Sequence, residues 1–205
     1  MSDNNNKIRI LTEIVYNALR TVLKSENYAI YGVIVGSMSS GKTTLALTLA
    51  SIFKRMFSDS KCYITQNLDY LTSIDKLDGK YVAIVFDDVS NRIRRFSNEL
   101  TNIYTVRHKG LDTINKNIFM LFNCHYLRSI APFIRSAPLR ALTSISEAEI
   151  KAYTNEYLFT TSVLWDYLYY VNKYPDKFIT LISVRGKERI IDVTNVILNE
   201  CEILE

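Results

Sequence analysis

The 205-residue chain contains little glycine, proline or cysteine, with six, three and three residues respectively. Since no Pro-, Gly- or Ser-rich linker divides it and 48% of its residues are hydrophobic, we expect one domain that buries a full core. The longest apolar runs are under ten residues, too short to span a bilayer, and the amino-terminal MSDNNNK lacks the apolar stretch of a secretory signal. We therefore expect a cytoplasmic protein without membrane insertion.

Cysteine and histidine are too few and too scattered to indicate a metal site. Cys62, Cys124 and Cys201 lie far apart and are odd in number, which favours a reducing compartment and ordinary buried thiols. His108 and His125 have neither metal spacing nor a Ser/Cys partner pattern, so we assign neither a catalytic role. The net charge is only +4, but Lys and Arg are dense at 92–95 and 107–109, which suits a polyanion at one face.

Hydrophobic periodicity predicts alternating strands and helices. Strand patterns cover residues 28–35, 61–66, 81–89, 117–123 and 139–145, and helix patterns cover 7–24, 43–57, 90–108, 127–135, 146–159 and 162–174. Residues 68–77 are expected to form a short helix or an irregular excursion. A terminal β-hairpin is expected from 177–185 and 188–196, with Gly186-Lys187 between them. The alternation predicts an α/β fold with a mainly parallel sheet flanked by helices. The chain divides into an N-terminal helix (1–27), a nucleotide-binding core (28–145), and C-terminal helices with the hairpin (146–205).

The segment Gly36-Ser37-Met38-Ser39-Ser40-Gly41-Lys42-Thr43 fits the phosphate-loop pattern G-x-x-x-x-G-K-[ST] at every fixed position. It lies between a strand pattern and a helix pattern, as this motif requires. The glycines let successive N–H groups surround a phosphate, the helix N-terminus adds partial positive charge, and Lys42 reaches the β- and γ-phosphates. Thr43 is expected to hold Mg²⁺ through its hydroxyl. We expect ATP as the ligand, with contacts from Gly36, Ser37, Met38, Ser39, Ser40, Gly41, Lys42, Thr43 and Thr44.

Two adjacent carboxylates, Asp87 and Asp88, follow the apolar residues 83–86. The carboxyl end of a parallel strand delivers its polar residues to the ligand crevice. Asp87 is predicted to bind Mg²⁺, directly or through water, and Asp88 to polarise the attacking water as general base. Asn123 ends the next strand pattern, where many ATPases place a sensor for the γ-phosphate or the lytic water. The alternative for the two acids is an Asp-Asp turn at the end of the strand. The alternative for Asn123 is a strand-end cap.

The order of these elements resembles the FtsK–HerA superfamily of RecA-like P-loop ATPases. Within it, the chain is most similar to the compact genome-packaging ATPases of poxviruses, related large DNA viruses and some archaeal viruses. The resemblance covers residues 28–145, and its specific part is the Arg107-His108 pair together with YLRSIAPFIR at 126–135. The family usually has glutamine where this chain has Asn123, and often glutamate where it has Asp88.

The resemblance implies a Mg²⁺-dependent ATPase that assembles as a ring and translocates or packages double-stranded DNA. In such rings an arginine of a neighbouring subunit neutralises charge on the γ-phosphate. By resemblance Arg135 is the first candidate for this catalytic role, followed by Arg107 and then by Arg94 or Arg95; a solvated helix charge is the alternative for each. The implied partners are double-stranded DNA, further copies of the chain, and capsid or other virion proteins. The implied location is the host cytoplasm, at the assembling virion.

Other functions stay open at this level. A DnaA-like or partition-type P-loop ATPase would use its nucleotide state to control assembly on DNA. A small-molecule kinase is disfavoured, because no compact arginine-rich lid follows the core strands. The tyrosine-rich run at 166–170 has helical spacing, and we expect an aromatic core or a subunit contact there rather than a base-stacking platform.

Overall fold

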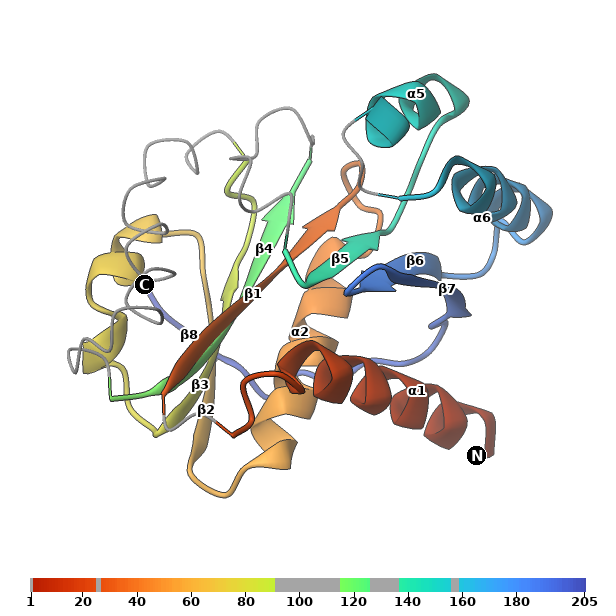
Figure 1. The fold of residues 1–205 in the computed structure, drawn as a ribbon. Coiled ribbons are helices and arrows are strands. Elements are labelled where there is room, and N and C mark those ends of the chain that lie inside the picture. Colours follow the sequence, from red (N-terminus) through yellow and green to blue (C-terminus); the bar gives the residue numbers. More distant parts are fainter. Residues whose placement is uncertain (1, 25–26, 91–114, 126–136, 156–158) are drawn as a thin grey trace.

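Figure 1 shows the computed structural model, which describes residues 2–24, 27–90, 115–125, 137–155 and 159–205. Within these residues one sheet has the strand order β7-β6-β5-β1-β4-β3-β2-β8. Its strands are β1 (Tyr28–Val35), β2 (Ser60–Thr65), β3 (Tyr81–Phe86), β4 (Asn117–Cys124), β5 (Leu139–Leu142), β6 (Ile179–Val184), β7 (Lys187–Asp192) and β8 (Glu202–Ile203). Along the row β5-β1-β4-β3-β2-β8, each strand is parallel to its neighbours. At the other end of the sheet, β6 pairs antiparallel with both β5 and β7. The predicted α/β fold with a mainly parallel sheet is confirmed.

Helices cover both faces of this sheet. Side chains alternate between the faces along each strand, so Ile30 and Ile34 of β1 pack towards one group of helices, and Tyr31 and Val33 pack towards the other. The first group is α1 (Ser2–Leu19) and α2 (Lys42–Met56); the second is η1 (Leu68–Thr72), η2 (Ile74–Lys76), α5 (Glu147–Asn155) and α6 (Thr161–Lys173). Among the described helices, none is both long enough and apolar enough to cross a membrane.

The bounds of α1 differ from the predicted 7–24. The helix begins earlier because its polar first turns find partners: Lys7 pairs with Asp3 at 3.2 Å, and the Asn4 side chain donates to the Asn195 carbonyl. It ends at Leu19, whose carbonyl accepts the N–H groups of Val22 and Leu23 in a closing turn. The helices predicted at 90–108 and 127–135 lie outside the described residues, apart from Ser90.

The predicted hairpin is present, but its turn is one residue earlier than expected. Val184 pairs with Lys187, so the turn is Arg185-Gly186 rather than Gly186-Lys187. Both turn residues have a positive φ, 50° and 81°, as two-residue hairpin turns of type I′ require. Since β6 also pairs with β5, the hairpin extends the core sheet.

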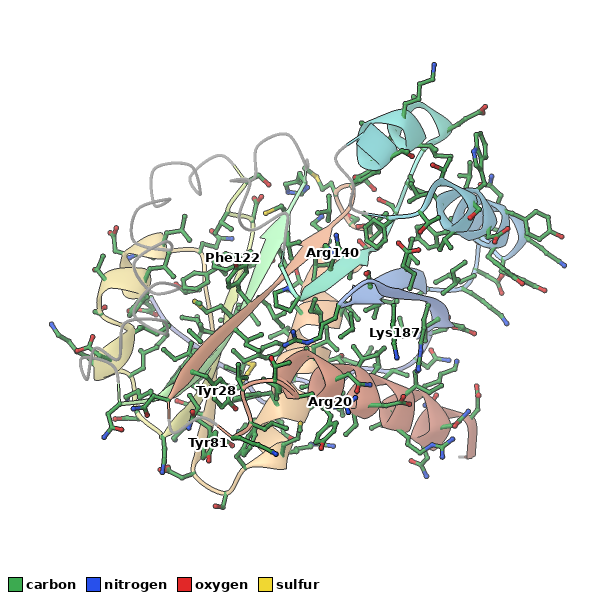
Figure 2. The ribbon with its side chains drawn as sticks, viewed as in Figure 1. Arg20, Tyr28, Tyr81, Phe122, Arg140 and Lys187 are labelled. Carbon is green, nitrogen blue, oxygen red and sulfur yellow. A yellow bond between two sulfur atoms is a disulfide. The ribbon has the colours of Figure 1, made fainter. Side chains whose placement is uncertain are left out.

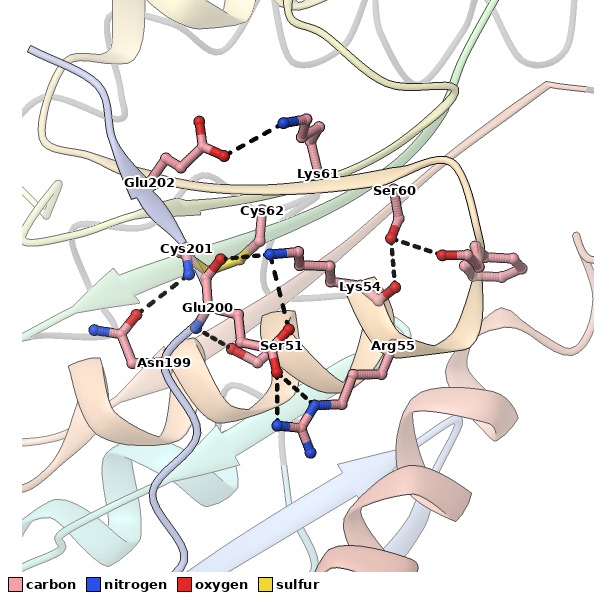
Figure 3. Close-up of polar contacts among 11 residues, drawn as sticks. Ser51, Lys54, Arg55, Ser60, Lys61, Cys62, Asn199, Glu200, Cys201 and Glu202 are labelled. Atoms are coloured by element: carbon pink, nitrogen blue, oxygen red, sulfur yellow. Dashed lines mark hydrogen bonds and ion pairs between the residues drawn. A yellow bond between two sulfur atoms is a disulfide. The ribbon is translucent and has the colours of Figure 1, made fainter.

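The C-terminal segment contains an unpredicted strand and a disulfide. β8 pairs with β2, which places Cys201 beside Cys62, and the two are joined as a disulfide (Figure 3). The same segment binds α2, because Glu200 accepts from Arg55 at 2.6 Å and its N–H donates to Ser51 Oγ at 2.9 Å. The prediction of ordinary thiols is therefore wrong for this pair. Cys124 is a free, buried thiol.

Candidate functional site

The predicted site residues of the phosphate loop, together with Asp87, Asp88 and Asn123, meet at the carboxyl edge of three adjacent parallel strands. β1 leads directly into the loop 36–41, β4 contains Asn123 near its end, and β3 is followed by Asp87. Because β4 lies between β1 and β3, its last residues stand between the loop and the acids. The sheet therefore brings the loop, Asn123 and Asp87, which are far apart in the sequence, to one place.

The loop is packed so closely that its two glycines leave no space for side chains. A Cβ on Gly36 would overlap Thr143 Oγ1 and lie 2.5 Å from Ser40 Oγ. Gly41 has a φ of 83°, and a Cβ there would lie 2.6 Å from the Phe178 ring. The loop therefore keeps a backbone conformation that exposes N–H groups at the start of α2, where a helix has no intrahelical partners for them.

Hydroxyl groups following β5 form a second wall of the loop. Ser40 Oγ lies 2.6 Å from Thr143 Oγ1, and the Ser37 N–H donates to Ser144 Oγ at 2.7 Å. Neither Thr143 nor Ser144 was predicted from the sequence. Their signal was the run of two hydroxyl residues inside the strand pattern 139–145, which ends on the same sheet edge as the loop.

Lys42 is folded back over its own loop. Its ammonium donates to the carbonyls of Gly36 at 2.9 Å and Ser37 at 2.6 Å, and lies 3.3 Å from His125 Nδ1. Burial lowers the pKa of Lys42, while the charges of Asp87 and Asp88 act in the opposite direction. An anion in the loop would offer the ammonium a charged acceptor in place of two neutral carbonyls.

Asp87 is held by two neighbours. The Thr43 hydroxyl donates to both carboxylate oxygens, at 2.9 and 3.1 Å, and Asn123 Nδ2 donates to Oδ1 at 2.7 Å. Hard oxygen donors beside a phosphate loop are the ligands that Mg²⁺ takes together with nucleotide phosphates. Asn123 Oδ1 is buried and has no hydrogen-bond partner among the described residues, which leaves one more acceptor at this place. Thr43 and Asp87 therefore fit the predicted ion.

Asp88, the second acid, contacts His125. Its backbone has a left-handed φ of 51°, its side chain is 58% exposed, and Oδ1 lies 2.8 Å from His125 Nε2. One neutral tautomer of the imidazole satisfies these two contacts, with Nε2–H donating to Asp88 and Nδ1 accepting from Lys42. The backbone N–H of His125 donates to Ser90 Oγ at 2.6 Å, which holds the backbone of this residue in place.

His125 was assigned no role from the sequence, and the structure places it between the loop lysine and the second acid. Its signal was positional, since it follows Asn123 by two residues at the end of the strand between β1 and β3. Of the other predicted contacts, Met38 is exposed and Thr44 lies in the first turn of α2. Arg135, Arg107, Arg94 and Arg95 lie outside the described residues.

Comparisons with known proteins establish the fold. No protein-family model matches the chain, and no curated protein matches its sequence. The genome packaging NTPase B204 of Sulfolobus turreted icosahedral virus 2, in complex with sulfate, is similar with a TM-score of 0.56 and 13% identity over 85% of this chain and 100% of that chain. Its complex with ATP-gammaS gives 0.52 and 12%, over 83% and 98%. At such identities the likeness shows a shared fold, the RecA-like P-loop NTPase fold.

Proposed function

We propose that this chain is a Mg²⁺-dependent ATPase of the FtsK–HerA type that forms a ring and translocates or packages double-stranded DNA. One observation carries the ATPase part: a tightly packed phosphate loop, an acid held by Thr43 and a second, exposed acid share one strand edge. The packaging part is supported by the sequence resemblance and by the likeness in fold to a viral genome packaging NTPase.

Binding falls to the loop and to the residues at the start of α2. Backbone N–H groups of Gly41, Lys42 and Thr43, together with the partial positive charge of the helix N-terminus, suit the phosphates of a nucleotide. Lys42 would turn from the Gly36 and Ser37 carbonyls to the β- and γ-phosphates. Thr43 and Asp87 would hold Mg²⁺, which supplies neutralisation of the phosphate charge when bound.

The chemical step falls to Asp88. Its exposed carboxylate, held by His125 at Oδ1, would accept a proton at Oδ2 from a water beside the phosphate loop, as a general base does. His125 orients that carboxylate through the contact from Nε2, while Asn123 keeps Asp87 in place. Lys42 also contacts His125, so movement of the lysine to a phosphate would remove one partner of the imidazole. Nucleotide binding would in this way change the contacts of the side chain that orients Asp88.

The test is ATP turnover with and without long duplex DNA. The wild-type protein should hydrolyse ATP faster with duplex DNA, whereas Lys42→Ala should show no turnover, because the backbone cradle cannot replace the charge of the ammonium. Lys76→Ala, which removes an exposed charge from η2, is the matched control and should behave as wild type. Normal turnover by Lys42→Ala would end the ATPase assignment. Assembly on DNA that depends on ATP but proceeds without stimulated turnover would favour the DnaA-like or partition-type alternative.

Ring assembly is tested by mixing two inactive variants. If Arg135 acts on a neighbour's γ-phosphate, Arg135→Ala should lose turnover while keeping nucleotide affinity, since the charge that it stabilises develops in the transition state. Combined with Lys42→Ala, it should recover part of the activity, because some interfaces then pair an intact loop with an intact arginine. Co-assembly without recovered activity, established by light scattering and turnover together, would assign Arg135 to its own subunit or to the fold.

A further inference from the structure

A groove with basic walls lies between the C-terminal end of α1 and the β6–β7 hairpin, away from the nucleotide site. Its volume is about 230 Å³, and the buried side chains of Ile14, Ile182 and Val184 line its base. The charged residues that line it are Glu13, Arg20, Arg185, Lys187 and Arg189. Four cations and one anion give the groove a net charge of +3, in a chain whose net charge is only +4.

Two of the arginines hold the walls of the groove together. Arg185, in the hairpin turn, donates to the Ala18 carbonyl at 2.9 Å and to Thr21 Oγ1 at 2.5 Å, at the end of α1. Arg189 pairs with Glu13 at 3.2 Å, and this pair is exposed on both sides. These contacts join the helix to the hairpin and fix the width of the groove, so its shape is set before any ligand arrives.

The other two cations are exposed, one on each wall. Arg20 follows α1 directly and Lys187 is the first residue of β7, as labelled in Figure 2. Neither side chain makes a hydrogen bond or ion pair with the residues that the structure describes. They can therefore bind an anion without breaking a contact within the chain.

We propose that this groove binds the sugar–phosphate backbone of double-stranded DNA. The inference rests on the proposed function and deepens it by naming the surface that contacts DNA. Lys and Arg bind the regularly spaced phosphates of a duplex without reading its bases, which suits a protein that moves along any sequence. Arg20 and Lys187, on the two facing walls, can each bind one phosphate of such a row, and Arg185 between them adds a third positive charge.

The position of the groove separates DNA from ATP. β6 runs antiparallel to β5, so the turn Arg185-Gly186 lies at the amino edge of the parallel strands, opposite the phosphate loop at their carboxyl edge. The two ligands would thus use different cations. DNA and nucleotide should bind together without competing for the same side chains.

The test is duplex binding by the full chain at a series of salt concentrations, measured by anisotropy of a labelled duplex. The double variant Arg20→Ala/Lys187→Ala should bind about 10-fold more weakly or worse at low salt, with a slope of log K against log salt that is shallower by about two. Its turnover of ATP without DNA should equal that of wild type, and stimulation by DNA should be lost. Its thermal melting confirms folding.

Two further variants separate position from charge. Lys76→Ala/Lys151→Ala removes two exposed charges from η2 and α5, outside the groove, and should keep the wild-type slope. Arg20→Lys/Lys187→Arg keeps both charges inside the groove and should keep most of the affinity, because phosphate binding of this kind depends on charge more than on the donor's shape.

The outcomes separate this inference from the function on which it rests. Wild-type affinity and slope in Arg20→Ala/Lys187→Ala would overturn the groove and leave the motor proposal standing. A wild-type protein that turns over ATP but does not bind duplex DNA would overturn both the groove and the DNA part of the proposed function. Binding of DNA through the groove by a protein without ATP turnover would uphold the groove and overturn the ATPase.

Discussion

Loss of the Cys62–Cys201 disulfide should lower the free energy of unfolding substantially. The bond closes a loop with a sequence separation of 139 residues, and the chain-entropy relation gives about 5 kcal/mol at 25 °C for a loop of that length. Native disulfides cost roughly 2 to 5 kcal/mol when removed. The ion pairs Arg55–Glu200 and Lys61–Glu202 remain after reduction, but such exposed pairs contribute only about 0.2 to 1 kcal/mol each.

The assay is urea unfolding of oxidised protein, reduced protein and Cys201→Ser. The free energy of unfolding of the reduced protein and of Cys201→Ser should each be lower by about 2 to 5 kcal/mol than that of the oxidised protein. Reductant should not lower the value of Cys201→Ser further. Titration of the denatured, unreduced wild type should find one thiol, Cys124, and three after reduction. Equal unfolding free energies for oxidised and reduced protein, or three thiols without reductant, would refute the role assigned to the bond.

Three further expectations concern the site and the buried thiol. Asp87→Asn should weaken Mg²⁺-nucleotide binding, whereas Asp88→Asn should keep binding and lower kcat by about 10²; calorimetry and turnover measured side by side check this, and equal loss of binding contradicts it. Gly36→Ala should weaken nucleotide binding because its Cβ would overlap the Thr143 hydroxyl, while Gly186→Ala, whose Cβ meets nothing within 4 Å but whose φ is 81°, should lower the stability of the hairpin and leave nucleotide binding unchanged in the same titration. Burial raises the pKa of Cys124 to about 12, so its thiol stays neutral and should resist alkylation in the folded protein; rapid labelling detected by mass spectrometry would contradict that.

The core strands and the loop were predictable because their signals are local. β1 matches its predicted bounds residue for residue, since all eight of its residues are buried and lie directly before the glycine of the loop. The acids and Asn123 reached the expected sheet edge because parallel strands deliver their last residues to one side. For the same reason Thr43 and Asp87 could be expected to meet without any knowledge of the strand order, and the Thr43 hydroxyl does donate to the Asp87 carboxylate.

The remaining features depend on contacts between distant segments. β8 is two residues long, and Glu202-Ile203 has no periodicity of its own; the pairing with β2 alone makes it a strand. The cysteine pair was missed for the same reason. The hairpin turn was predicted one residue too late, with Gly186 as its first residue. The first residue is Arg185, which adopts a positive φ that non-glycine residues seldom take.

The strand β8 also limits how copies of this chain can meet. An uncovered edge strand offers its free N–H and C=O groups to another chain, which can add to the sheet as a further strand. Within the part of the chain that the structure describes, the disulfide-bound segment occupies the edge of β2, and the two-residue strand β8 is the outermost strand at that end. A two-residue edge offers few backbone groups for a further strand, so copies that met on this side would make contact mainly through side chains. Two bodies joined in that way keep the freedom to pivot against each other, which a sheet running unbroken across the boundary would remove.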